Sequence, residues 1–196
     1  MPGPRSTRRA LLDAARGEFA AHGLAGARVD RIAAAAGVNK QRIYGHFGNK
    51  DGLFAAVVDD ALDDLLAIVT LPDGEQGETG ALLREYVGQV SRYHRDHPEF
   101  LRLLQWEALE NACPADPASA RAARYREKVE QFGRRLGMPR DQAASVLFGV
   151  IGLAAWPQVL PQLAALIVGA ENGREFVEER TLDWALGVAE RAGPQA

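Results

Sequence analysis

The sequence lacks the features that mark secreted, disulfide-linked and membrane-spanning proteins. Its 196 residues include a single cysteine, Cys113, which excludes an intrachain disulfide framework and predicts a reducing, cytoplasmic setting. Residues 1–9 are polar and basic rather than apolar, so we expect no signal peptide. The most apolar stretch, about residues 146–168, is interrupted by Pro157 and Pro161 and favours a buried helix pair over a membrane span.

Two further absences bear on fold and chemistry. No segment alternates apolar and polar residues as β-strands do, whereas apolar residues recur at helical spacing, so we predict an all-α fold. The sequence shows no paired catalytic residues, phosphate-binding loop or convincing metal cluster, which disfavours an enzyme with a helical fold. His94 and His97, with Asp96 or Glu99, would form a poor closed metal site, and we predict neither a metal nor a cofactor.

Charge is distributed unevenly along the chain. The whole chain has a net charge of −3, but residues 1–52 carry nine basic and four acidic side chains, a net +5, and the remainder carries −8. A basic segment on an acidic body suits a polyanionic partner that is met at one end of the chain. Charge alone does not distinguish DNA from RNA.

Helical spacing and turn residues divide the chain into ten expected helices and two domains. We expect domains at residues 1–50 and 51–196. Pro98, Pro139 and Pro157 each fit the first turn of a helix. The expected helices cover about residues 6–22, 29–36, 39–47, 50–69, 79–97, 98–111, 117–136, 140–155, 157–168 and 173–191. On the fourth helix we interpret the acidic stripe as a solvated face rather than a metal site; it comprises Asp59, Asp60, Asp63 and Asp64.

Residues 28–47 have the pattern of two short helices that cross around a tight turn. Ala33 provides a small residue at the crossing, Gly37 provides the turn, and the Asn39 side chain can cap the start of the second helix. The residues expected to face inward are Ile32, Ala36, Val38 and Ile43. Those expected to project from the second of these helices are Lys40, Gln41, Arg42, Tyr44 and His46. An ordinary helical hairpin is the alternative, but the coincidence of spacing, outward polar groups and local positive charge favours insertion into a DNA major groove.

At these positions the chain resembles the tetracycline-repressor (TetR) family of bacterial regulators. The resemblance covers residues 8–58 and rests on Ala14-Ala15, Phe19, Gly23, Ile32-Ala33, Gly37-Val38, Ile43-Tyr44, His46-Phe47, Lys50 and Leu53. It implies an N-terminal three-helix helix-turn-helix domain joined to a C-terminal helical domain for ligand binding and dimerisation. It also implies a repressor that binds a pseudo-palindromic operator in double-stranded DNA as a homodimer and is released by a small apolar or aromatic effector. The alternatives are a helical protein-interaction module and a transcriptional activator without a small-molecule ligand.

The resemblance also assigns roles to individual residues. Bases or nearby phosphates would be faced by Lys40, Gln41 and Arg42. The DNA backbone would be contacted by Tyr44, His46 and Lys50. Arg28 is a further phosphate candidate. Small residues are common in the family at positions 40–42, so the base contacts of this chain are expected to differ from those of its relatives. Arg5, Arg8 and Arg9 form either a solvated tail or a segment that follows the minor groove.

The C-terminal half is expected to provide the dimer interface and a ligand pocket. We place the interface within about residues 140–191, on segments 140–168 and 173–191, where Gly149 and Gly152 allow close helix approach. The apolar residues on that segment, which could equally form a core within one chain, are Leu147, Val150, Ile151 and Ala154. The candidate pocket-lining aromatic residues, for which a core role is the alternative, are Tyr86, Tyr93, Phe100, Trp106 and Tyr125.

Overall fold

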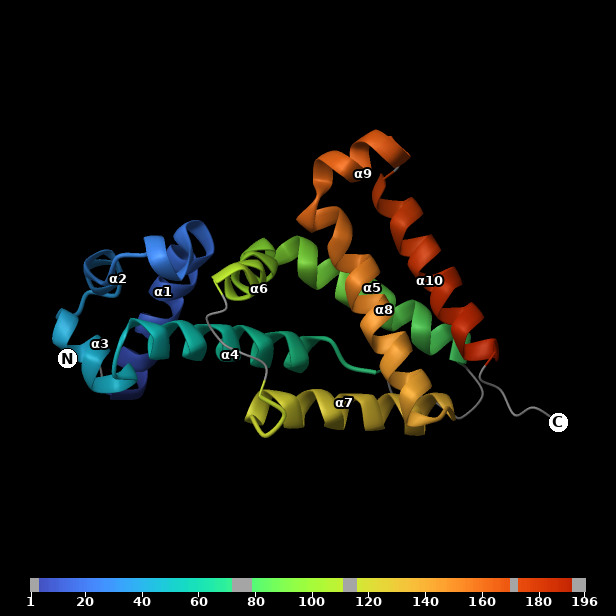
Figure 1. Ribbon diagram of the computed structural model, residues 1–196, viewed down its shortest axis with the longest axis horizontal. Coiled ribbons are helices and arrows are strands. Elements are labelled where there is room, and N and C mark those ends of the chain that lie inside the picture. The colour runs from blue at the N-terminus through green and yellow to red at the C-terminus, as the bar shows by residue number, and fades with distance from the viewer. Residues whose placement is uncertain (1–3, 72–78, 111–115, 170–172, 192–196) are drawn as a thin grey trace. The chain divides into compact units, whose positions relative to one another are not determined.

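The computed structural model describes residues 4–71, 79–110, 116–169 and 173–191 (Figure 1). Within these residues the chain forms ten helices and no strand, so the all-α prediction is confirmed. The helices are α1 (Pro4–Gly26), α2 (Val29–Ala35), α3 (Lys40–Phe47), α4 (Lys50–Ile68), α5 (Thr79–Asp96), α6 (Pro98–Glu110), α7 (Ala120–Leu136), α8 (Arg140–Val159), α9 (Pro161–Val168) and α10 (Gly173–Arg191).

Three helix starts differ from the prediction, and the first of them is α1, which begins at Pro4 rather than at about residue 6. α7 begins at Ala120 rather than Pro117, because the Ser119 side chain accepts a hydrogen bond of 3.1 Å from the Ala122 amide and caps the helix. The predicted start at Pro157 is wrong, since α8 continues through Pro157 to Val159. Pro157 removes one N–H donor from α8, and the helix ends two residues later. It is Pro161 that occupies the first turn of α9.

Packing divides the chain into two units, each of which is described by itself. Unit 1 comprises Met1–Leu65 and His97–Ala115, and unit 2 comprises Leu66–Asp96 and Asp116–Ala196. Packing therefore does not divide the chain at the predicted boundary between residues 50 and 51, because α4 buries an apolar face in unit 1. The assignment of residues 1–50 to DNA binding and of 51–196 to regulation concerns function and stays a prediction.

The core of unit 1 is built around α1, which packs against α2 and α6. The rings of Phe19 on α1 and Phe54 on α4 meet edge to face, with their centroids 5.0 Å apart. The largest apolar side chains that this core buries are Leu11, Leu12, Phe19, Ile32, Ile43, Leu53, Phe54 and Leu62. Because Ile32 lies on α2 and Ile43 on α3, this one core holds both short helices in place.

The acidic stripe of α4 is in part an ion-pairing surface. In unit 1, Arg16 on α1 donates to the Asp60 carboxylate at 2.8 Å and also pairs with Asp64, and Arg9 donates to Asp60 at 3.2 Å. The interpretation of the whole stripe as a solvated face is therefore wrong for Asp60 and Asp64. The spacing of acids along one helix cannot reveal arginines on another helix, which is why the sequence did not indicate these pairs.

The core of unit 2 lies between α8 and the helices α5, α7 and α10 (Figure 1). α8 buries Val146, Leu147, Val150 and Ala154 inside the unit. α8 is also the one described helix that is long and apolar enough to cross a membrane, but the core helix of a soluble protein passes the same test. The prediction that residues 146–168 form a buried helix pair is correct only in part for α8, which also exposes Phe148 and Trp156. It is wrong for much of α9, because Leu166 and Ile167 on that helix are exposed.

His94 is a buried titratable group in unit 2. Its side chain is 1% exposed on α5. Burial lowers the pKa of His94 from its ordinary value of 6.5 to about 4, although a hydrogen bond with the backbone of Ala154 opposes this shift. The imidazole is therefore neutral in the folded chain at neutral pH.

We expect the free energy of unfolding to fall as the pH drops from 6.5 to 4. In this range the unfolded chain binds a proton at His94 that the folded chain does not bind. The stability that the neutral His94 contributes to the folded chain is fully present above about pH 6.5 and is lost by about pH 4. Its size is on the order of 3 kcal/mol. Urea unfolding of the His94→Gln variant, which keeps an N–H donor but does not titrate, should show a flatter profile. A profile identical to that of the parent protein would contradict this assignment.

Candidate DNA-binding surface

α2 and α3 form a helix-turn-helix whose turn has the predicted geometry. Gly37 adopts a φ of +65°, which favours glycine, and the Val38 amide donates to the Ala33 carbonyl at 3.0 Å across the turn. The Asn39 side chain accepts a hydrogen bond of 3.0 Å from the Gln41 amide, so its predicted role as the cap of α3 is confirmed. Ile43 is fully buried. The local sequence therefore sets the turn and the start of α3, and the burial of Ile43 orients the helix.

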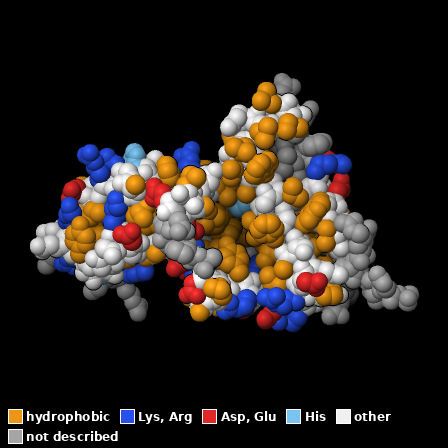
Figure 2. Space-filling view, viewed as in Figure 1, with side chains coloured by type: hydrophobic (Ala, Val, Ile, Leu, Met, Phe, Trp, Pro, Cys, Tyr) orange, Lys and Arg blue, Asp and Glu red, His pale blue; other side chains and the backbone are white. Residues whose placement is uncertain are grey.

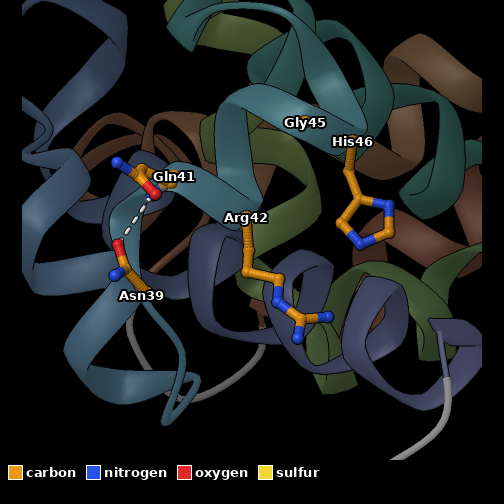
Figure 3. A pocket seen from close by; sticks show the side chains of 5 residues that line it. All are labelled: Asn39, Gln41, Arg42, Gly45 and His46. Atoms are coloured by element: carbon orange, nitrogen blue, oxygen red, sulfur yellow. Dashed lines mark hydrogen bonds between the residues drawn. The ribbon is translucent and has the colours of Figure 1, made fainter.

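The outer face of α3 is polar and hollowed. Figure 3 shows Arg42 and His46 extending from this face, and the shallow hollow is lined by Asn39, Gln41, Arg42, Gly45 and His46. Tyr44, on the same helix, is 44% exposed. The structure thus brings hydrogen-bonding, cationic and aromatic groups together on one short helix, as base and phosphate recognition requires.

Lys40 is exposed but has a partner on α2. Its ammonium lies 2.9 Å from the Asp30 carboxylate. The hydrogen bond with Asp30 raises the pKa of Lys40, so this side chain is charged at neutral pH. Asp30, in the first turn of α2, was not among the sequence-predicted site residues. A phosphate or a base could replace this carboxylate as the partner of Lys40, or could accept from another of its three N–H donors.

Arg28 lies in the short segment that joins α1 to α2, and Lys50 contacts the backbone of that segment and of the end of α1. The Lys50 ammonium donates to the carbonyls of Ala25 and Ala27, both at 3.2 Å. The Arg28 amide donates to the Glu18 carboxylate at 2.8 Å, and the Arg28 side chain is exposed at the start of α2. The sequence indicated both cations but not the carbonyls that hold the Lys50 ammonium or the Glu18 carboxylate that holds the Arg28 backbone.

The N-terminal arginines are in different environments. The Arg8 guanidinium lies 5.5 Å from the ring centroid of Phe47, at the end of α3. Arg9 instead pairs with Asp13 at 2.8 Å and with Asp60, so it is directed toward α4. The Arg5 side chain lies outside the described residues. Neither the solvated-tail nor the minor-groove interpretation is tested by these contacts.

The predicted pocket-lining residues are divided between the two units. In unit 2, Tyr86 is buried and its ring meets that of Phe132 at 4.7 Å, while Tyr93 is buried on α5 and Tyr125 is half-buried on α7. Burial raises the pKa of Tyr86, and the nearby Tyr125 adds a smaller effect in the same direction. In unit 1, Phe100 is buried and Trp106 is half-buried on α6. The pocket stays a prediction, and Cys113 lies outside the described residues.

Comparison with known proteins identifies the family to which both halves of the chain belong. Residues 11–57 match the bacterial regulatory proteins of the tetR family, and residues 83–182 match the tetracyclin repressor-like C-terminal domain. The similarity thus extends beyond residues 8–58, where the sequence motifs lie.

Individual relatives agree with this assignment. The chain is 40% identical to the HTH-type transcriptional repressor SCO4008 of Streptomyces coelicolor. The matched region spans 178 residues and covers 85% of each chain. It is 30% identical to the transcriptional repressor NicS of Pseudomonas putida, over 69% of this chain and 66% of that one. SCO4454, a TetR-family regulator from Streptomyces coelicolor, has the same fold, with a TM-score of 0.68, 24% identity and 97% of each chain covered. The chain therefore belongs to the TetR family of helix-turn-helix transcriptional regulators.

Proposed function

We propose that this protein is a cytoplasmic repressor that binds a pseudo-palindromic DNA operator as a homodimer. The polar outer face of α3 carries this proposal, because a helix held by a tight turn with exposed hydrogen-bonding and cationic groups suits a major groove. The names of SCO4008 and NicS as repressors support repression. The residues that we assign to DNA contact are Arg28, Lys40, Gln41, Arg42, Tyr44, His46 and Lys50.

An exposed apolar stripe on α8 supports dimerisation through segments 140–168 and 173–191. Phe148 is 81% and Trp156 is 55% exposed, and Gly152 lies midway between them, one helical turn from each. Figure 2 shows hydrophobic side chains gathered over α8 and α9. Burial of such a stripe against a second copy removes apolar surface from water, and Gly152 permits close approach of the partner helix.

Three of the four apolar residues that the sequence suggested for the interface are core residues, which was the stated alternative, whereas Ile151 is half-buried. Leu147, Val150 and Ala154 are buried within unit 2, so they belong to the core of the single chain. Gly149 also serves that core, because a Cβ atom there would overlap the ring of Trp184 on α10. The opposite face of α8 is the one that remains for a partner.

A small apolar or aromatic effector is the proposed signal that releases the DNA. The buried aromatic rings of Tyr86 and Tyr93 in unit 2 support an apolar effector, and so does the family assignment. We assign no catalytic role to any residue.

Selection of bound sequences from a random-sequence duplex pool tests the DNA-binding proposal. We expect enrichment of two inverted half-sites whose centres are about one helical turn or more apart, because a two-fold dimer presents two copies of α3. DNase footprinting should then protect both half-sites. Binding that depends on salt but enriches no sequence would contradict an operator-binding repressor, since a basic surface alone binds DNA without selectivity.

A further inference from the structure

Side chains from α6 hold the end of α1 from its break at Gly23 together with the residue that follows it, a segment that we call the Gly23–Ala27 turn. Gly23 has a φ of +67° and interrupts α1. In an unbroken helix the Leu24 amide would donate to the Ala20 carbonyl. Here the Leu24 amide donates to the Glu110 carboxylate at 2.8 Å, and the indole N–H of Trp106 donates to the Ala20 carbonyl at 3.3 Å. α6 therefore satisfies both groups that the break separates.

The contact between α6 and the turn is tight. The Ala25 amide also donates to the Glu110 carboxylate, at 3.2 Å. A Cβ atom on Gly23 would lie 2.6 Å from a carboxylate oxygen of Glu110 and 2.8 Å from the indole ring of Trp106. A larger residue at Gly23 would have to displace the side chains of Glu110 and Trp106, so these two side chains pack directly against the turn.

The other side of the same turn holds Lys50. The carbonyls of Ala25 and Ala27 accept hydrogen bonds from the Lys50 ammonium, both at 3.2 Å. An ammonium has three N–H donors, so these two bonds orient the group and leave a third donor for an anion. Hydrogen bonds thus run from Glu110 on α6, through the backbone of the turn, to Lys50 at the start of α4.

We propose that Glu110, assisted by Trp106, is a positioning residue for DNA binding. It holds the Gly23–Ala27 turn so that the Ala25 and Ala27 carbonyls direct the Lys50 ammonium toward the phosphate backbone. A free lysine side chain samples many rotamers, and fixing it before binding lowers the entropic cost of the phosphate contact. This role rests on the proposed contact between Lys50 and DNA.

A double-mutant cycle separates this role from simple stabilisation of the fold. The variants are Glu110→Ala, Glu110→Gln, Lys50→Met and the Glu110→Ala/Lys50→Met pair. The probe is a fluorescein-labelled duplex that carries the site recovered by selection, and its Kd is measured by anisotropy at several NaCl concentrations. Lys50→Met should lower the salt slope by about 0.9 for each lost phosphate contact.

We expect Glu110→Ala to raise the Kd about tenfold, because a loss of this size is typical when a charged hydrogen-bonding partner is removed. We also expect the salt slope to fall toward that of Lys50→Met. In the Lys50→Met background the same change should cost less than about twofold, because the lysine that it positions is gone. Glu110→Gln should stay within about threefold of the parent, since its amide oxygen accepts the same bonds. Hydrogen exchange in the free protein should quicken at Leu24 and Ala25 in Glu110→Ala.

An equal rise in Kd with and without Lys50, at the salt slope of the parent, would overturn this role and leave Glu110 as a cap of the turn. A parent-like Kd for Glu110→Ala, or for Lys50→Met, would overturn it as well, while sequence-selective binding by the parent would still support the proposed repressor. If Glu110→Ala does not fold, Glu110→Asp, whose carboxylate is one methylene shorter, takes its place in the same cycle.

Discussion

Replacing Lys40 and Arg42 together by alanine is expected to weaken binding to the selected operator by about a hundredfold or more. Both side chains are exposed on α3, and Arg42 lines the hollow on its outer face (Figure 3). A base or phosphate contact of this kind contributes about tenfold or more to affinity, and the surface pair between Lys40 and Asp30 is readily exchanged for a DNA contact. Fluorescence anisotropy with the selected duplex measures the loss.

The single variants tell what each side chain recognises. A residue that reads a base should relax the preference at one position of the site, whereas a residue that contacts phosphate should weaken all sequences alike and reduce the salt slope. Arg134→Ala is the matched control, because Arg134 is an exposed arginine on α7 that pairs with Glu130 at 3.9 Å. Parent-like binding by Lys40→Ala/Arg42→Ala would exclude the outer face of α3 as the recognition surface.

Phe148→Glu is expected to raise the dissociation constant of the homodimer by more than about a thousandfold. Phe148 is 81% exposed on the single chain, so the change should leave the fold of unit 2 intact. Dimer formation by this variant would bury an unpaired carboxylate, which costs about 3–5 kcal/mol. Two-fold symmetry places that charge in the interface twice. Sedimentation equilibrium should show a monomer at concentrations where the parent is a dimer.

Leu109→Glu is the control for this experiment. Leu109 is 77% exposed on α6 in unit 1, outside the proposed interface, so its replacement should leave the dimer unchanged. A dimer that survives Phe148→Glu would place the interface away from α8. The loss of dimerisation should also remove protection of the second half-site in footprinting, since one copy presents one α3 helix.

Local patterns in the sequence determined the helices and the helix-turn-helix. Gly37 adopts the backbone conformation that few other residues tolerate, Asn39 caps α3 and Ile43 is buried, each as spacing along a single element predicted. Such features involve residues within a few positions of one another, so their energetics are visible in the order of residues alone. Pro157 is the exception: proline is favoured in the first turn of a helix, yet here it lies inside α8, two residues before the helix ends.

Only the tertiary structure decided which face of each helix meets which partner. It assigned Leu147, Val150 and Ala154 to the core of unit 2 and left Phe148 exposed, although both faces of α8 are apolar in the sequence. Long-range polar partners were equally hidden: Glu110 reaches the Leu24 amide across 86 positions of chain. Helical spacing records the period of a helix but not its rotation about its own axis, and that rotation is fixed by packing against elements distant in sequence. The sequence by itself therefore determined a DNA-binding helix and its family, whereas the tertiary structure decided what holds that helix in place.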